Sequence, residues 1–101
     1  MSDKKFEAIN SVDFINPKTD GVDRSVGANI MENGDLVISG LDWGALAHDM
    51  LGGDYEYSVT IEAQLKDSVL LLLLQEKFKD FPPAKDWLEQ KGVPFSAWKW
   101  G

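Results

Sequence analysis

Side chains that could perform chemistry are sparse in this sequence. His48 is the only histidine, and its neighbour Asp49 is the first candidate for a catalytic partner. Adjacent residues of a helix do not face each other, so these two do not form a dyad. Glu56 and Glu62 share one face of a predicted strand but lie roughly 20 Å apart, too far for paired catalytic carboxylates. No serine has the Gly-x-Ser-x-Gly context of a nucleophile, since 37-VISG-40 has only the trailing glycine. We therefore predict that the protein is not an enzyme.

The residue types and their spacing give equally little evidence for a metal or cofactor site. The chain contains no cysteine, which excludes thiolate catalysis, zinc–thiolate sites and disulfides. Its aspartates do not follow the spacing of a calcium-binding loop. Gly52-Gly53 lacks the Lys-Ser/Thr pair that follows the glycines of a phosphate-binding loop. We expect neither a metal nor a cofactor.

The charge of the chain favours a basic protein partner. Ten basic and 17 acidic residues give a net charge of −7, and residues 1–54 hold ten of the acids but only four of the bases. Such a chain repels phosphate backbones and anionic lipids, so we expect no direct binding to nucleic acid or membranes. A basic protein would be attracted to its acidic surface. The candidate contact residues are Asp20, Asp23, Asp35, Asp42, Asp49 and Glu56.

The pattern of apolar residues predicts a single α+β domain over residues 1–101. Strands are predicted at 5–15, 28–32, 35–39 and 54–62, and helices at 42–51, 65–78 and 83–91, with a loop at 16–25 and a last strand or extended cover at 93–100. Asn33-Gly34 predicts a two-residue hairpin turn, because both residues tolerate positive φ, and Gly40 ends the second hairpin strand. Asp42 is the predicted N-cap of the first helix. This order predicts an antiparallel or mixed sheet with about three helices packed on one face.

The helix at 65–78 contains six consecutive apolar residues, Val69–Leu74. Its apolar positions cover more than half of the helix circumference, so we expect cover on two sides. The Tyr55–Ile61 strand face and the tryptophan-rich C-terminal segment are the predicted covers. The alternative is an exposed patch that forms a homodimer through Leu71 and Leu72.

The sequence also favours a cytoplasmic protein. Residues 1–15 lack the apolar stretch of a secretory signal, and the absence of cysteine is compatible with a reducing compartment. The run Val69–Leu74 is far shorter than the roughly 20 apolar residues needed to cross a membrane.

Three segments carry a resemblance to a protein group: 36-LVISGLDWG-44, 54-DYEYSVTIEAQLKDSVLLLLLQEKF-78 and 87-WLEQKGVPFSAWKW-100. They resemble small acidic bacterial proteins of largely unassigned function that are associated with toxin–immunity loci. The resemblance covers roughly the C-terminal two-thirds of the chain, and 54-DYEY-57 and the leucine run are its most specific parts. It implies binding of a protein partner rather than catalysis, and it supplies no site residues.

These observations give one main hypothesis and two alternatives. The main hypothesis is an intracellular immunity or inhibitor protein that binds a basic partner such as a toxin. One alternative is a small-molecule-binding or enzymatic domain with a pocket near Trp43, His48, Tyr55 and Tyr57. The other is a structural homodimer subunit that uses the leucine-rich helix.

Overall fold

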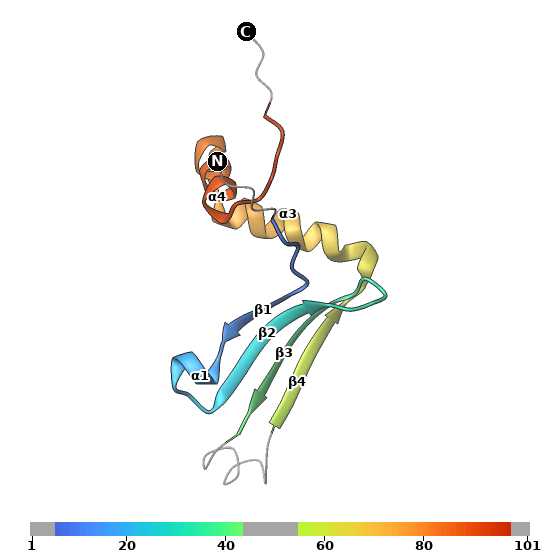
Figure 1. The fold of residues 1–101 in the computed structure, drawn as a ribbon. Coiled ribbons are helices and arrows are strands. Elements are labelled where there is room, and N and C mark those ends of the chain that lie inside the picture. Colours follow the sequence, from blue (N-terminus) through green and yellow to red (C-terminus); the bar gives the residue numbers. More distant parts are fainter. Residues whose placement is uncertain (1–5, 44–54, 98–101) are drawn as a thin grey trace. The chain divides into compact units, whose positions relative to one another are not determined.

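The computed structural model describes residues 6–43 and 55–97. The chain divides into two compact units: a sheet unit, residues 9–67, and a helical unit, made of residues 1–8 and 68–101. That the two units form one domain stays a prediction. In chain order the described elements are β1 (Ser11–Ile15), α1 (Pro17–Asp20), β2 (Arg24–Ile30), β3 (Leu36–Asp42), β4 (Tyr55–Ile61), the 3-10 helix η1 (Ala63–Leu65), α3 (Lys66–Lys77) and α4 (Phe81–Lys91) (Figure 1).

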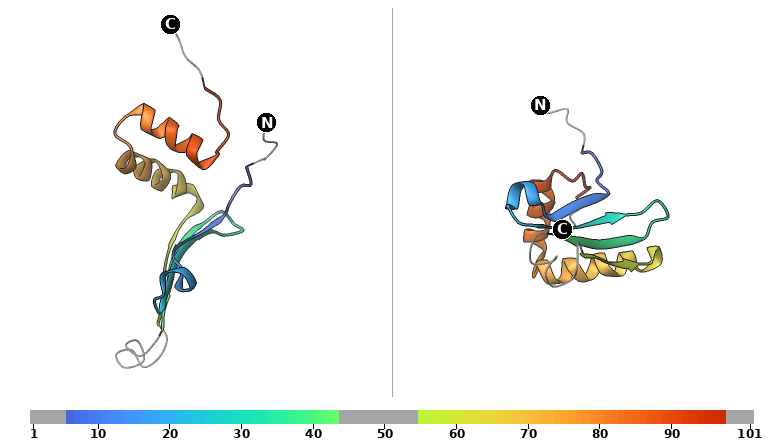
Figure 2. Two further views of the ribbon diagram at one scale, coloured as in Figure 1. Left: turned by 60° about the vertical axis from the view of Figure 1, so that its left-hand side comes forward. Right: turned by 90° about the horizontal axis from the view of Figure 1, so that it is seen from below.

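The four strands form one antiparallel sheet in the order β1-β2-β3-β4, so each strand pairs with its neighbours in sequence. The right-hand view of Figure 2 shows them side by side, with β1 in blue and β4 in yellow-green at the outer edges. This sheet, with about three helices in the described part of the chain, confirms the predicted α+β class. The packing of the helices on one sheet face stays a prediction.

The β2–β3 hairpin is confirmed, but the predicted two-residue turn is wrong. The Met31 N–H donates to the Asp35 carbonyl at 2.8 Å, and the Gly34 N–H donates to the Met31 carbonyl at 2.9 Å, which leaves a three-residue loop, Glu32–Gly34. Only Gly34 has positive φ, at 94°, while Asn33 does not. This is the pattern of a three-residue hairpin loop, in which a left-handed glycine follows an ordinary turn.

β3 continues through Gly40 to Asp42, so two further predictions are wrong: Gly40 does not end the strand, and Asp42 is not a helix N-cap. Gly40 pairs with Tyr57, and a Cβ at Gly40 would overlap the Tyr57 ring. The glycine therefore makes room for an aromatic ring instead of interrupting the strand. Asp42 is the last residue of β3 and pairs with Arg24 and Tyr55. The rest of the predicted helix at 42–51 lies outside the described residues.

The β1 strand is shorter and less regular than predicted. It begins at Ser11, so residues 6–10 of the predicted strand 5–15 are not part of it. Its register against β2 shifts between Asp13 and Ile15, which leaves Phe14 as the extra residue of a bulge. The predicted loop at 16–25 contains the one-turn helix α1, which Asn16 caps by accepting a hydrogen bond from the Lys18 N–H at 2.9 Å.

The register gives the sheet two chemically different faces. The predicted alternation of residues 54–62 places Tyr55, Tyr57, Val59 and Ile61 on one face, and the residues paired with them across β3 and β2 share it. This apolar face also carries Val26, Ala28, Ile30, Leu36 and Ile38. The opposite face, called the polar face below, carries mostly polar side chains together with Val37 and Leu41. Its polar residues are Ser11, Asp13, Ser25, Asn29, Ser39, Glu56, Ser58 and Thr60.

The helical unit contains α4 and most of α3. Asp80 caps α4, because its carboxylate accepts the Phe81 N–H at 2.8 Å, and Gly92 ends it in a left-handed conformation with φ 74°. The rings of Phe78 and Trp87 meet edge to face at 5.9 Å between centroids. The predicted helices 65–78 and 83–91 are confirmed to within about two residues. Residues 93–97 form no strand, so of the two forms predicted for 93–100 the strand is wrong over that range, and the extended cover stays a prediction. Residues 98–100 lie outside the described residues.

The leucine run is not enclosed by its own unit. Leu71 and Leu72 are 65 % and 60 % exposed, the largest values in the run. Cover by the Tyr55–Ile61 face would involve both units and stays a prediction. No helix in the described part of the chain is long and apolar enough to cross a membrane.

The contact between Gly40 and Tyr57 gives a stability prediction. Gly40→Ala should lower the free energy of unfolding by about 1–3 kcal/mol, the usual cost of forcing a packed side chain to move. Its neighbour Ser39 lies on the polar face, so Ser39→Ala should change stability by no more than about 0.5 kcal/mol. Urea unfolding followed by circular dichroism measures both values. Equal stability of the two variants would contradict the packing of Tyr57 on Gly40.

Candidate functional site

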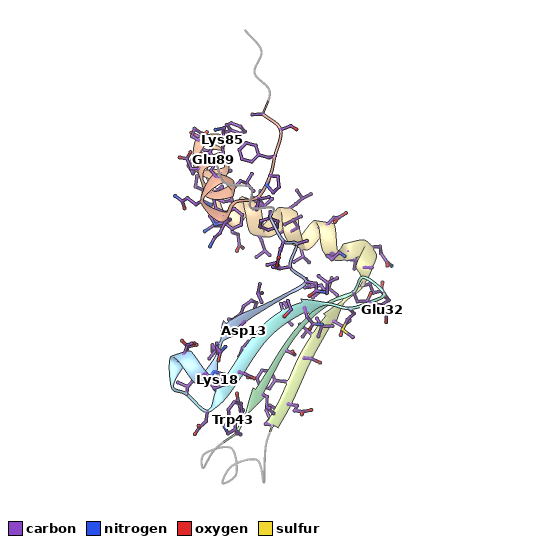
Figure 3. All side chains as sticks on the ribbon, viewed as in Figure 1. Asp13, Lys18, Glu32, Trp43, Lys85 and Glu89 are labelled. Carbon is purple, nitrogen blue, oxygen red and sulfur yellow. The ribbon has the colours of Figure 1, made fainter. Side chains whose placement is uncertain are left out.

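The polar face of the sheet is hollowed. An open concavity of about 1020 Å³ is lined by residues from all four strands, and the side chains that face it are small and mostly polar. We call it the polar hollow. Its polar side chains are Ser11, Asp13, Ser25, Asn29, Ser39, Glu56 and Ser58. Figure 3 labels Asp13 on β1, at one side of this face.

The charge of the polar hollow is entirely acidic. Asp13 and Glu56 are its charged lining residues, and the lining includes no lysine, arginine or histidine. They come from opposite edge strands, Asp13 from β1 and Glu56 from β4. Asp13 accepts one hydrogen bond, from the Asn16 side-chain amide at 3.2 Å. Each carboxylate can accept several hydrogen bonds, so the hollow is suited to a cationic ligand that also donates hydrogen bonds.

Serines between the two acids suit the same kind of ligand. Ser25, Ser39 and Ser58 are on β2, β3 and β4, and Ser25 pairs with Leu41 while Ser39 pairs with both Gly27 and Ser58. A row of hydroxyls can both donate and accept hydrogen bonds, and it leaves space for a bulky side chain from a ligand.

A second polar group lies on the opposite face, at the end of the sheet where β3 ends. The Arg24 Nε donates to Asp42 Oδ1 at 2.8 Å, and the Tyr57 hydroxyl donates to the same oxygen at 2.9 Å. Asp42 is 22 % exposed at its side chain, whereas Arg24 is 54 % exposed. Desolvation alone would raise the pKa of Asp42, but the hydrogen bonds from Arg24 and Tyr57 and the positive charge of Arg24 together lower it. The hydrogen bond to Asp42 is the main reason that the pKa of Tyr57 is raised.

Three of the six predicted contact acids take part in local structure. Asp20 accepts the Asn16 N–H at 2.8 Å and so closes the α1 turn. Asp35 accepts the Ala63 N–H at 2.9 Å, which ties the hairpin loop to the start of η1. Asp42 is paired with Arg24, so its charge is largely neutralised where it stands.

Of the other three predicted contact acids, the structure describes Glu56 and Asp23. Glu56 lines the polar hollow, as expected of a contact residue. Asp23 precedes β2, and its carbonyl accepts the Trp43 N–H at 3.0 Å. Asp49 lies outside the described residues. The sequence prediction omitted Asp13, although it alternates with Val12 and Phe14 and this alternation already placed it on the polar side of its strand.

Of the four residues predicted to line the alternative pocket, Trp43, His48, Tyr55 and Tyr57, the structure describes all but His48. The rings of Tyr55 and Tyr57 lie 5.6 Å apart on the apolar face, opposite the polar hollow. Trp43 directly follows β3, and His48 lies outside the described residues. Within residues 6–43 and 55–97, no group of three or more acids or histidines is placed to hold a metal ion.

No protein-family model matches this chain, and neither a curated protein nor a solved structure matches it significantly. The resemblance to small acidic immunity-type proteins therefore stays a prediction.

The Arg24–Asp42–Tyr57 group gives a pH prediction. A folded-state pKa of Asp42 below the unfolded value means that the ionised carboxylate stabilises the fold above the unfolded pKa of about 3.9. That stability is lost as the pH falls through the lower folded-state pKa. Asp42→Asn should therefore weaken the acid dependence of the unfolding free energy, as measured by urea unfolding between neutral and strongly acidic pH. An acid dependence identical to that of the wild type would contradict the role given to Asp42.

Proposed function

We propose that the protein is a non-enzymatic binding module that holds a basic segment of a protein partner in its polar hollow. The most concrete form of this proposal is an intracellular immunity or inhibitor protein that neutralises a basic toxin. The observation that carries it is the lining of the hollow: acids from two edge strands, hydroxyls between them and no basic side chain.

The chemistry of the hollow favours arginine or lysine from the partner. Glu56 and Asp13 can each accept charge-assisted hydrogen bonds, which are about twice as strong as neutral ones. The hydroxyls of Ser25, Ser39 and Ser58 supply further acceptors between them. A loop or helix of the partner with one or two basic side chains could therefore pair its charge with these acids. Its remaining N–H donors could bond to the serine hydroxyls.

The net charge of the chain supports the same partner class. A net charge of −7 attracts a basic protein over distances longer than any single contact, and such attraction raises association rates. On this view the acids divide into two groups. Glu56 and Asp13 contact the partner directly, whereas Asp20 and Asp35 hold local structure and contribute mainly to the field, and Asp42 is paired with Arg24. We keep Asp23 as a contact at the edge of this surface.

An inhibitor also needs little more than a rigid, complementary surface. The polar hollow is built on the strands of a regular sheet, and strands hold side chains in more defined positions than loops do. A basic toxin that acts on nucleic acid needs its own cationic surface to bind phosphates. An acidic protein that covers this surface would block the toxin by competition alone.

The direct test is binding of the product of the adjacent gene. The immobilised wild type should capture this product at low salt and release it at high salt, since exposed charge pairs are screened. The double variant Asp13→Asn, Glu56→Gln should weaken binding by about ten- to hundredfold, the range expected for removing two interfacial charge contacts.

A matched control separates the polar hollow from net charge. Glu76→Gln and Asp67→Asn together remove two negative charges from α3, outside the lining of the hollow. This control should retain most of the affinity. Equal losses in both double variants would show that only net charge matters, and the absence of binding at any salt concentration would reject the proposed partner.

A further inference from the structure

The direction of the backbone hydrogen bonds in β4 follows from two bonds of the β2–β3 pair. The Trp43 N–H donates to the Asp23 carbonyl at 3.0 Å, and the Met31 N–H donates to the Asp35 carbonyl at 2.8 Å. Bonded and non-bonded residues alternate along an antiparallel pair. The odd-numbered residues of β3 therefore bond to β2, and its even-numbered residues bond to β4.

This parity leaves one row of backbone groups on β4 without a strand partner. The residues of β4 opposite the even-numbered residues of β3 are odd-numbered, from Tyr55 to Ile61, and they turn toward β3. The N–H and carbonyl groups of Glu56, Ser58 and Thr60 consequently point away from the sheet. β4 is the last strand of the order β1-β2-β3-β4, and in the described part of the chain these three residues make no other backbone hydrogen bond.

The two edges of the sheet differ in how well they are protected against another strand. β1 has five residues and a bulge at Phe14, and both features discourage the addition of a strand. β4 has seven residues in unbroken register, with no proline, lysine or bulge. Only β4 therefore offers a long, regular edge for pairing.

We propose that β4 pairs antiparallel with β4 of a second copy of this chain, with Ser58 opposite Ser58 of that copy. This register pairs the whole strand Tyr55–Ile61 with itself and uses every outward-pointing backbone group of Glu56, Ser58 and Thr60. A closed dimer with two-fold symmetry and a continuous eight-stranded sheet results.

The side chains of β4 are complementary in this register. Within Tyr55–Ile61, Glu56 lies opposite Thr60 of the second copy, so no two acids of the paired strands face each other. Tyr57 lies opposite Val59, an aromatic and β-branched pair of the kind that stabilises antiparallel strands, and Tyr55 lies opposite Ile61 in the same way. Tyr55 and Val59 are 48 % and 58 % exposed, so both have apolar surface left to bury.

One of the two neighbouring registers brings like charges together. A shift of two residues toward the C-terminal end would place Glu56 opposite Glu62 of the second copy, and like charges directly opposite each other destabilise a strand pair. In the Ser58-centred dimer both polar faces lie on the same side of the joined sheet. The two hollows then present Glu56 from each copy next to the symmetry axis, which suits a partner with two basic segments.

Two lysine substitutions on the same strand should have opposite effects on self-association. Ser58→Lys places two ammonium groups opposite each other across the axis and should weaken the dimer by up to about fivefold. Thr60→Lys places an ammonium opposite Glu56 of the second copy, twice per dimer, and should tighten it by about two- to thirtyfold. Sedimentation equilibrium measures the dimer dissociation constant of both variants. A salt concentration of about 0.15 M is used because it screens the long-range repulsion between the acidic chains.

Three results would overturn the proposal. The first is a wild type that stays monomeric at every concentration at which it is soluble. The second is an equal effect of the two lysine substitutions, as expected if β4 binds only a basic partner or nothing. The third is a dimer that Leu71→Glu dissociates and Ser58→Lys does not, which would place the contact on α3. Circular dichroism confirms folding, and if Ser58→Lys does not fold, the tightening by Thr60→Lys still decides between the outcomes.

Discussion

The register of β3 between its two neighbours is the constraint on which the functional surface depends. Side chains alternate between the faces of a strand, so a slip of one residue between β3 and β4 would move Glu56 to the opposite face from Asp13. Two features hold the register at opposite ends of β3. The left-handed Gly34 sets the hairpin loop at one end, and Asp42 bonds to Arg24 of β2 and Tyr57 of β4 at the other. Gly40 contributes the space that lets the Tyr57 ring reach Asp42.

This register separates the apolar face from the face proposed to bind a partner. The apolar face carries valine, isoleucine, leucine and tyrosine side chains, together with the Arg24–Asp42 ion pair at one end. The polar face carries Asp13 and Glu56 with hydroxyl and amide side chains, and Val37 and Leu41 among them. The same alternation leaves the outward backbone groups of β4 available, so the proposed binding face and the proposed dimer edge meet at Glu56.

The sequence predicted most elements but not the roles of individual acids. Strict alternation in residues 54–62 was enough to predict β4 and its two faces, and Asn33-Gly34 was enough to predict a hairpin. The loop length could not be predicted, because Asn-Gly fits both two- and three-residue loops. Gly40 was misread because a glycine in a strand signals an end unless a ring covers it, and the ring is 17 residues away in the sequence.

The roles of the acids were harder to predict because their hydrogen-bond partners are distant in sequence. Asp35 bonds to the Ala63 backbone and Asp42 to Arg24, and no local pattern shows either contact. Composition identified an acidic chain but could not separate acids that hold the fold from acids that face a hollow. The alternation that placed Glu56 on a solvated strand face is confirmed, and the same reasoning applied to β1 places Asp13 on the same face of the sheet. The polar hollow itself required the pairing of all four strands.

Amide hydrogen exchange along β4, measured by NMR in dilute protein, tests the register most directly. The account predicts that the amides of Tyr57, Val59 and Ile61 are protected, because they bond to β3, and that those of Glu56, Ser58 and Thr60 exchange rapidly. Protection of the even-numbered amides should appear only as the protein concentration is raised. Rapid exchange at the odd-numbered positions, with protection at the even-numbered positions in dilute protein, would contradict the register and the surfaces derived from it.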